Sequence, residues 1–108
     1  MRKIHKYSFG SVGAGYMTIR SIGKDLEILD IIEDNGYFTA WCLLEPVIVS
    51  EHPDEQNIHD ITIFAAILGD AVPEDEGYTY VKTIRAFDHV VYNIFIKIEH
   101  KTYKEIIT

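Results

Sequence analysis

The dipeptide Asn35-Gly36 separates two segments rich in β-branched and aromatic side chains, residues 26–34 and 37–44. Asn-Gly is the preferred pair for a type I′ turn, because both of its residues must take a positive φ. A two-residue turn fixes the register of the hairpin that it closes. The predicted register sets Asp34 opposite Tyr37, Ile32 opposite Thr39, Asp30 opposite Trp41 and Ile28 opposite Leu43.

This register divides the hairpin into a nearly apolar face and a mixed face. The apolar face is expected to turn toward the core, because successive side chains of a strand alternate between the two faces of a sheet. Its members are Leu29, Ile31, Phe38, Ala40, Cys42 and Leu44. Trp41 and Tyr37 lie on the mixed face, which we expect to be half covered or functional.

Strand-like segments recur along the rest of the chain at residues 4–9, 16–22, 58–68, 78–86 and 90–98. With the two hairpin segments this makes about seven strands, with turns roughly every 8–12 residues, as in small sandwiches and barrels. The pattern therefore predicts an all-β, antiparallel sandwich or barrel. A length of 108 residues predicts a single domain. We expect a β core over residues 1–99 and a tail over residues 100–108.

Charge is strongly segregated along the chain. Residues 25–81 hold fourteen Asp and Glu and no Lys or Arg, whereas the two ends hold all ten basic residues and three acids. The ends can therefore pair with the middle, within one molecule or between copies, and a homo-oligomer is one possible outcome. The net charge of −7 argues against direct binding of nucleic acid.

The sequence shows no catalytic or metal-binding constellation, and we expect a non-enzymatic protein without a cofactor. His52 and His59 lie among carboxylates, but their spacing fits no common metal pattern, so a solvated acidic loop over residues 51–60 is expected. The glycines at 10, 13 and 15 are not followed by the Lys-Ser/Thr of a phosphate-binding loop. Cys42 falls on the apolar face, which predicts a buried and inert thiol.

Two groups of residues are candidates for binding. The first combines aromatic and basic side chains that could stack on a base and pair with a phosphate if the hairpins converge, the alternative being core packing and surface tyrosines. It comprises Trp41, Tyr37, Lys82, Arg85 and Tyr92. The second is the acidic run Asp70, Glu74, Asp75 and Glu76, which could meet a basic partner protein or be a solvated loop.

Several short stretches resemble a family of small, uncharacterised β proteins found mostly in bacteriophages and prophages. The stretches are Lys6-Tyr7, Asn35-Gly36, Trp41-Cys42-Leu43-Leu44-Glu45-Pro46, Tyr80-Val81-Lys82-Thr83-Ile84 and Val91-Tyr92-Asn93-Ile94-Phe95. The family pattern is KYxL, an NG turn followed by LWALVDP, a GTG loop, YIGTV and FVWHVFE. The chain departs from it at Tyr92-Asn93, at Gly69-Asp70-Ala71 and in the longer loop at 10–15. The resemblance, over about residues 4–98, implies a phage accessory protein and no particular reaction.

Two hypotheses for function follow. In the first, the protein binds and inhibits a host protein, in particular a defence protein. In the second, an oligomer of the chain sequesters a small nucleotide immune signal. A single cysteine and the lack of a signal peptide or a long apolar run predict a protein of the host bacterial cytoplasm that does not enter the membrane.

Overall fold

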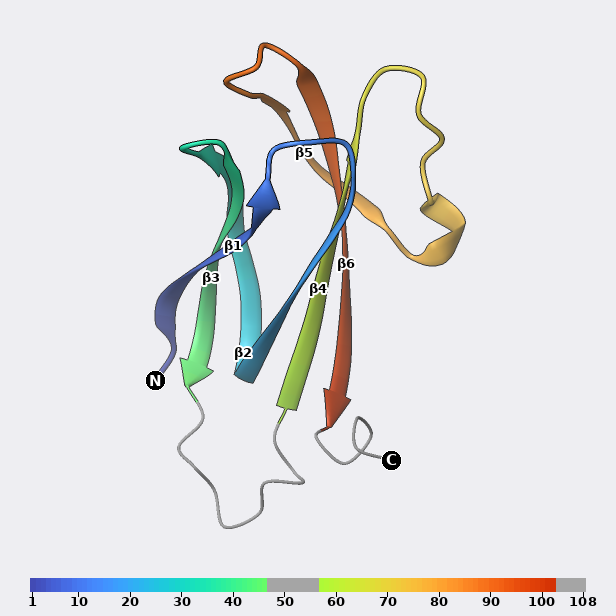
Figure 1. Ribbon diagram of the computed structural model, residues 1–108. Coiled ribbons are helices and arrows are strands. Elements are labelled where there is room, and N and C mark those ends of the chain that lie inside the picture. The colour runs from blue at the N-terminus through green and yellow to red at the C-terminus, as the bar shows by residue number, and fades with distance from the viewer. Residues whose placement is uncertain (47–56, 103–108) are drawn as a thin grey trace.

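A computed structural model describes residues 1–46 and 57–102, and these residues form an antiparallel all-β fold (Figure 1). The described residues contain β1 (Lys3–Ser11), β2 (Gly15–Asp34), β3 (Tyr37–Pro46), β4 (Asn57–Ala66), a 3₁₀ turn η2 (Glu74–Glu76), β5 (Thr79–Arg85) and β6 (Val91–Thr102). The strands are hydrogen-bonded in the order β1-β3-β2-β4-β6-β5. The predicted all-β, antiparallel class is confirmed.

Strand β2 turns a corner and belongs to two layers. Its first arm, residues 15–22, pairs with β4, and its second arm, residues 23–34, pairs with β3. In Figure 1 the first arm descends beside β4 and the second rises beside β3. The φ of Gly23 is 156° and that of Asp25 is 54° at the corner. The two segments predicted at 16–22 and 26–34 are therefore the two arms of one continuous element.

Gly23 is required at the corner because the backbone of β2 passes very close to β3. A Cβ atom at position 23 would lie 2.6 Å from the carbonyl oxygen of Glu45 and 2.7 Å from Cγ of Leu44. Both distances are well inside van der Waals contact. The absence of a side chain thus lets the two layers meet, since any other residue would push β2 away from β3.

The predicted hairpin is confirmed for most of its length. Asn35 and Gly36 have φ values of 51° and 86°, as a type I′ turn requires, and Asp30 lies opposite Trp41. Beyond that pair a bulge at Leu29 shifts the register, so that Ile28 lies opposite Cys42 and not opposite Leu43.

The bulge corrects two predictions about this hairpin. Ile28 does not face Leu43, and Leu29 is not a core residue, because its side chain is 45% exposed. A bulge inserts one residue into a strand and turns the side chains beyond it to the other face. The apolar pattern could not reveal it, because Ile28 and Leu29 are equally apolar.

The core lies between the two layers. The other predicted core residues of the hairpin are fully or almost fully buried, namely Ile31, Phe38, Ala40, Cys42 and Leu44. All of them except Leu44 share one cluster with buried residues of the opposite layer, which include Ile63, Ala65, Ile84, Tyr92 and Ile94. Phe38 packs edge-on against Tyr92 with the ring centroids 5.4 Å apart. This contact between β3 and β6 joins the two layers at the centre of the fold.

A second, smaller apolar cluster lies on the outer face of the β4 layer. Four aromatic residues form one row across β2, β4, β6 and β5, because the strand registers align Tyr16, Phe64, Phe95 and Tyr80. Tyr16 contacts Phe64 at 4.7 Å and Tyr78 at 5.8 Å between ring centroids. Phe64 is consequently only 9% exposed although it faces outward. This row is invisible in the sequence, because it depends on the registers of four strands.

The corner of β2 generates a stability prediction. Gly23→Ala is expected to lower the free energy of unfolding by about 2–3 kcal/mol, since the new methyl group overlaps Glu45 and Leu44. Gly15→Ala is the matched control, because Gly15 also has a positive φ, 113°, but has no atom within 4 Å of the added Cβ. Urea unfolding measures both variants. Equal losses in the two would show that close approach at the corner is not what requires glycine.

Candidate functional site

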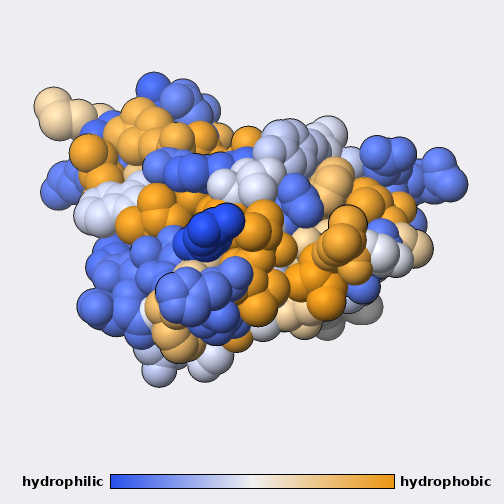
Figure 2. Space-filling model, turned by 90° about the horizontal axis from the view of Figure 1, so that it is seen from above, coloured by the Kyte–Doolittle hydropathy of each residue, from blue (hydrophilic) through white to orange (hydrophobic). Residues whose placement is uncertain are grey.

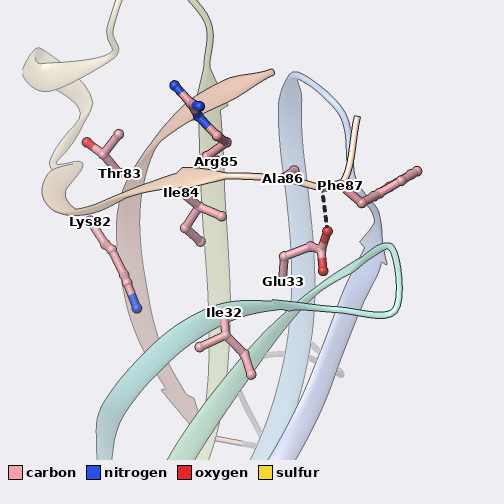
Figure 3. Close-up of a pocket in the computed structure, with 8 residues that line it drawn as sticks. All are labelled: Ile32, Glu33, Lys82, Thr83, Ile84, Arg85, Ala86 and Phe87. Carbon is pink, nitrogen blue, oxygen red and sulfur yellow. Dashed lines mark hydrogen bonds between the residues drawn. The ribbon is translucent and has the colours of Figure 1, made fainter. Parts of the chain in front are cut away.

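The second arm of β2 and strand β5 lie side by side, and two side-chain interactions bridge them. Nζ of Lys82 donates to Oδ1 and Oδ2 of Asp30, at 2.9 and 3.2 Å. The backbone N–H of Phe87 donates to Oε1 of Glu33 at 2.7 Å (Figure 3). In the described part of the chain no strand ladder joins β2 to β5. These interactions therefore link β2 to β5 and to the turn after it, along a seam where no strand ladder of the described residues closes the curled sheet.

A hollow of about 380 Å³ opens along the seam, between residues 32–33 of β2 and residues 82–87. In Figure 3, Lys82 and Ile84 extend toward Ile32, whereas Thr83 and Arg85 point to the other side of β5. The cation inside the hollow is thus Lys82, whose charge is balanced by Asp30. Arg85 lines the rim, is exposed, and forms no ion pair with a described residue.

Of the predicted aromatic and basic group, only Lys82 and Arg85 border the hollow, and their side chains point to opposite sides of β5. Trp41 and Tyr37 lie on the outer face of the β3 layer, 37% and 49% exposed. The amine of Lys6 lies 5.6 Å from the ring centroid of Trp41 and is also ion-paired with Asp34. Trp41 and Tyr37 do not line the hollow.

Tyr92, the fifth member of that group, is a core residue. It is 4% exposed, and its hydroxyl donates to Oδ2 of Asp88 at 2.8 Å. Burial is the main cause that raises the pKa of Tyr92, and the hydrogen bond to Asp88 and the negative charge of Asp88 add to it. The hydroxyl is therefore engaged inside the protein and is kept protonated.

The basic ends of the chain pair with its acidic middle within the fold. Of seven ion pairs among residues 1–46 and 57–102, six join these two parts of the sequence, and the seventh joins Lys97 to Glu99. The six are the N-terminal amine with Glu45, Arg2 with Glu27, Lys6 with Asp34, Arg20 and Lys101 with Asp60, and Lys82 with Asp30. Much of the segregated charge is thus compensated between neighbouring strands.

The acidic loop, residues 67–78, is left out of this compensation. Asp70, Glu74, Asp75 and Glu76 are exposed and form no ion pair with any residue that the structure describes. Asp70 orders the start of the loop, because its Oδ2 accepts from the backbone N–H of Ile67 at 3.0 Å. The other three acids form η2. The structure therefore places all four predicted partner-binding acids on one connection between β4 and β5.

Exposed apolar side chains accompany these acids. Leu68, in the acidic loop, is fully exposed, and Ile67 and Val72 are 38% and 37% exposed. The start of this loop and the 86–90 turn, with Phe87 66% exposed, lie at the same end of the fold. Figure 2 views this end and shows apolar patches between strongly polar ones. A contiguous apolar patch rimmed by polar residues is a mark of a protein-binding surface, whereas single exposed apolar side chains are normal.

The remaining candidates for chemistry are accounted for as follows. Cys42 is fully buried, as predicted, and burial raises the pKa of its thiol to about 11. His59 was expected in a solvated loop, but it belongs to β4 and is 3% exposed, because β4 begins at Asn57. The rest of that predicted loop, with His52, lies outside the described residues. Within the described ranges, no three His, Cys, Asp or Glu side chains are grouped to hold a metal.

Comparison of the chain with protein-family models, curated proteins and solved structures finds no match. In residues 1–46 and 57–102 no helix is long and apolar enough to span a membrane. The candidate sites therefore have to be assessed on their own geometry.

The seam between β2 and β5 generates a local prediction. Glu33→Ala removes the acceptor for the N–H of Phe87, and amide exchange at Phe87 is expected to become roughly tenfold faster for a loss of about 1.4 kcal/mol. Glu33→Gln keeps an oxygen acceptor and should retain most of the protection. Hydrogen exchange followed by NMR distinguishes them. Unchanged protection in Glu33→Ala would mean that this bond does not hold the 86–90 turn.

A second prediction concerns Cys42. The native protein is expected to react with a thiol reagent at pH 8 only as fast as it opens, because the thiol is buried and its pKa is about 11. The measurement is the reaction rate with a chromogenic disulfide, with urea-unfolded protein as the reference. A native rate close to the unfolded rate would contradict the buried position of Cys42.

Proposed function

We propose that this chain is a non-enzymatic binding protein that inhibits a protein of its bacterial host by direct contact. The resemblance to phage and prophage proteins extends the proposal to a phage accessory protein that acts in the host cytoplasm against a defence protein. The acidic loop is the contact surface in this proposal, and the partner presents a basic surface.

One observation carries this choice of surface. The fold pairs the basic ends of the chain with the acidic strands, yet it leaves four acids of one loop without a cation among the described residues. Unpaired charge of one sign on an exposed loop steers encounter with an oppositely charged protein. The exposed Leu68 beside these acids offers an apolar anchor.

A second candidate function is the sequestration of a small nucleotide in the hollow between β2 and β5. Lys82 inside the hollow favours it, with Arg85 at the rim, whose side chain points to the other side of β5. The support is weaker than that for the first proposal. A nucleotide is an anion, but Asp30 neutralises Lys82 and Glu33 adds a second carboxylate to the hollow. Native mass spectrometry with a nucleotide panel tests this candidate directly.

The first proposal predicts that neutralising the acidic loop abolishes partner binding. The loop variant carries Asp70→Asn, Glu74→Gln, Asp75→Asn and Glu76→Gln. The Asn at position 70 keeps the acceptor for the N–H of Ile67. Affinity for a partner captured by the wild type, then purified and identified, should fall by about tenfold or more, and the wild-type affinity should weaken with salt.

The matched control makes the same change of net charge elsewhere. It carries Asp25→Asn, Glu27→Gln, Glu45→Gln and Glu99→Gln, and it should bind within about threefold of the wild type because it leaves the loop intact. Binding is measured by biolayer interferometry at several salt concentrations. An equal loss in both variants would mean that net charge, and not the loop, governs binding. Full binding by the loop variant would overturn the proposed surface.

A further inference from the structure

The buried His59 and the exposed His100 form a pair beside the corner of β2. His59 is 3% exposed, and its Nε2 lies 3.0 Å from the carbonyl oxygen of Gly23. Its Nδ1 lies 2.5 Å from Nδ1 of His100, with the two rings nearly perpendicular at 86°. The pair therefore connects β2, β4 and β6 at the place where β2 changes layer.

The positions of the protons follow from these contacts. A carbonyl oxygen can only accept, so Nε2 of His59 carries the hydrogen that it donates to Gly23. A neutral imidazole has one N–H, and Nδ1 of His59 is therefore an acceptor. Nδ1 of His100 must then be the donor. The contacts form one directed chain, from His100 to His59 to the carbonyl of Gly23.

We propose that His59 and His100 form a proton-sensitive clasp that holds the corner of β2 against β4 and β6 and releases it on acidification. A proton added to the exposed ring of His100 enters at its Nε2 and leaves the chain of hydrogen bonds intact. Once His100 is protonated, it can no longer become an acceptor by moving its own proton, and a proton added to His59 can enter only at Nδ1. Two N–H groups would then face each other across 2.5 Å, and the rings must separate.

Among residues 1–46 and 57–102, the groups around the clasp contribute no compensating negative charge. From β2, Ser21 lies opposite His59, and its hydroxyl donates to the phenol oxygen of Tyr7 of β1 at 3.0 Å. His5 of β1 stacks on Tyr7, 6.1 Å between ring centroids. From β3, the side chain of Leu44 approaches Gly23, and Glu45 is paired with the N-terminal amine.

The carboxylates next in sequence to the two histidines belong to the opposite face. Asp60 and Glu99 directly adjoin His59 and His100, so strand alternation turns them to the outside of the sheet. Asp60 binds Arg20 and Lys101 there, and Glu99 is paired with Lys97. No described carboxylate is hydrogen-bonded or ion-paired to either ring.

The direction of the pH effect follows from the surroundings of His59. Burial lowers the pKa of His59 below its ordinary value of 6.5; the hydrogen bond to Gly23 opposes this shift and the charge of His100 adds to it. Below pH 6.5 the opened state binds a proton that the closed clasp excludes. The stability contributed by neutral His59 is therefore complete above pH 6.5 and decreases as the pH falls below it.

Two measurements on the full chain test the clasp. The ¹⁵N shifts of the imidazole rings report which nitrogen carries a proton, and we expect Nδ1 of His59 to be the unprotonated one at pH 7.5. Amide exchange at the facing ends of β4 and β6, corrected for intrinsic rates, should accelerate as the pH falls below 6.5, by up to about tenfold per pH unit, because opening takes up one proton.

The variants separate the clasp from general acid sensitivity. His59→Gln can keep a donor and an acceptor but does not titrate, so this acceleration should disappear in it. His89→Asn is the control, because His89 lies exposed in the 86–90 turn at a positive φ that asparagine tolerates. The control should retain the full pH dependence.

Three results would overturn the proposal. The first is a protonated Nδ1 on His59 at pH 7.5, and the second is a His59 ring that titrates at or above pH 6.5. The third is an unchanged acid response in His59→Gln. If His59→Gln does not fold, the ring shifts and the titration of the wild type alone decide the outcome.

Discussion

The fold depends on the close approach of the β2 backbone to β3 at Gly23. There the chain leaves the β4 layer and enters the β3 layer without an intervening loop. The missing side chain lets the layers converge, and the carbonyl of the same residue accepts the hydrogen bond from His59. The corner is thus held by close packing against Leu44 and Glu45 of β3 and by the hydrogen bond from His59 of β4. The core between the layers, the seam beside β5 and the histidine clasp all depend on this position of β2.

Charge pairing is the second organising feature, and it links the fold to the proposed function. The pairs between the basic ends and the acidic middle are mostly exposed, so each contributes little to stability. Their larger effect is on the surface potential. They neutralise charges on the strands, whereas the acids of the acidic loop have no ion-pair partner among residues 1–46 and 57–102. The function that we propose rests on these four acids of the acidic loop. The hollow at the seam has no comparable unpaired charge among the described residues. Lys82 is paired with Asp30, and Glu33 accepts a hydrogen bond from Phe87.

The sequence predicted those features that depend on neighbouring residues. Asn35-Gly36 determined the turn, and its register held as far as the pair of Asp30 and Trp41. The bulge at Leu29 could not be predicted from the sequence. Ile28 and Leu29 are both apolar, so either side chain could face the core. The burial of His59 was missed, because its polar flanking residues suggested a solvated loop, although the strand predicted over residues 58–68 contains it.

The candidate site was predicted in part. The four acids lie on one exposed loop, and Lys82 and Arg85 both border the hollow, but their side chains point to opposite sides of β5. Trp41 does not lie at the hollow with Lys82, because Trp41 is on the outer face of the β3 layer. The sequence alone could not show on which side of the fold each residue would lie. Likewise, the burial of Tyr92 became evident only from its packing on Phe38. Contacts between strands distant in sequence depend on the corner of β2, which no local pattern encodes.

The most direct test of this account is a set of cross-strand nuclear Overhauser effects for the two arms of β2. The account predicts contacts between Thr18 and Thr62 and between Ile32 and Thr39, with extended backbone on both sides of Gly23. It also predicts an approach of Gly23 to the side chain of Leu44. Contacts of residues 27–34 with β4, or a flexible loop at residues 22–26, would contradict the shared strand on which the rest of the structure depends.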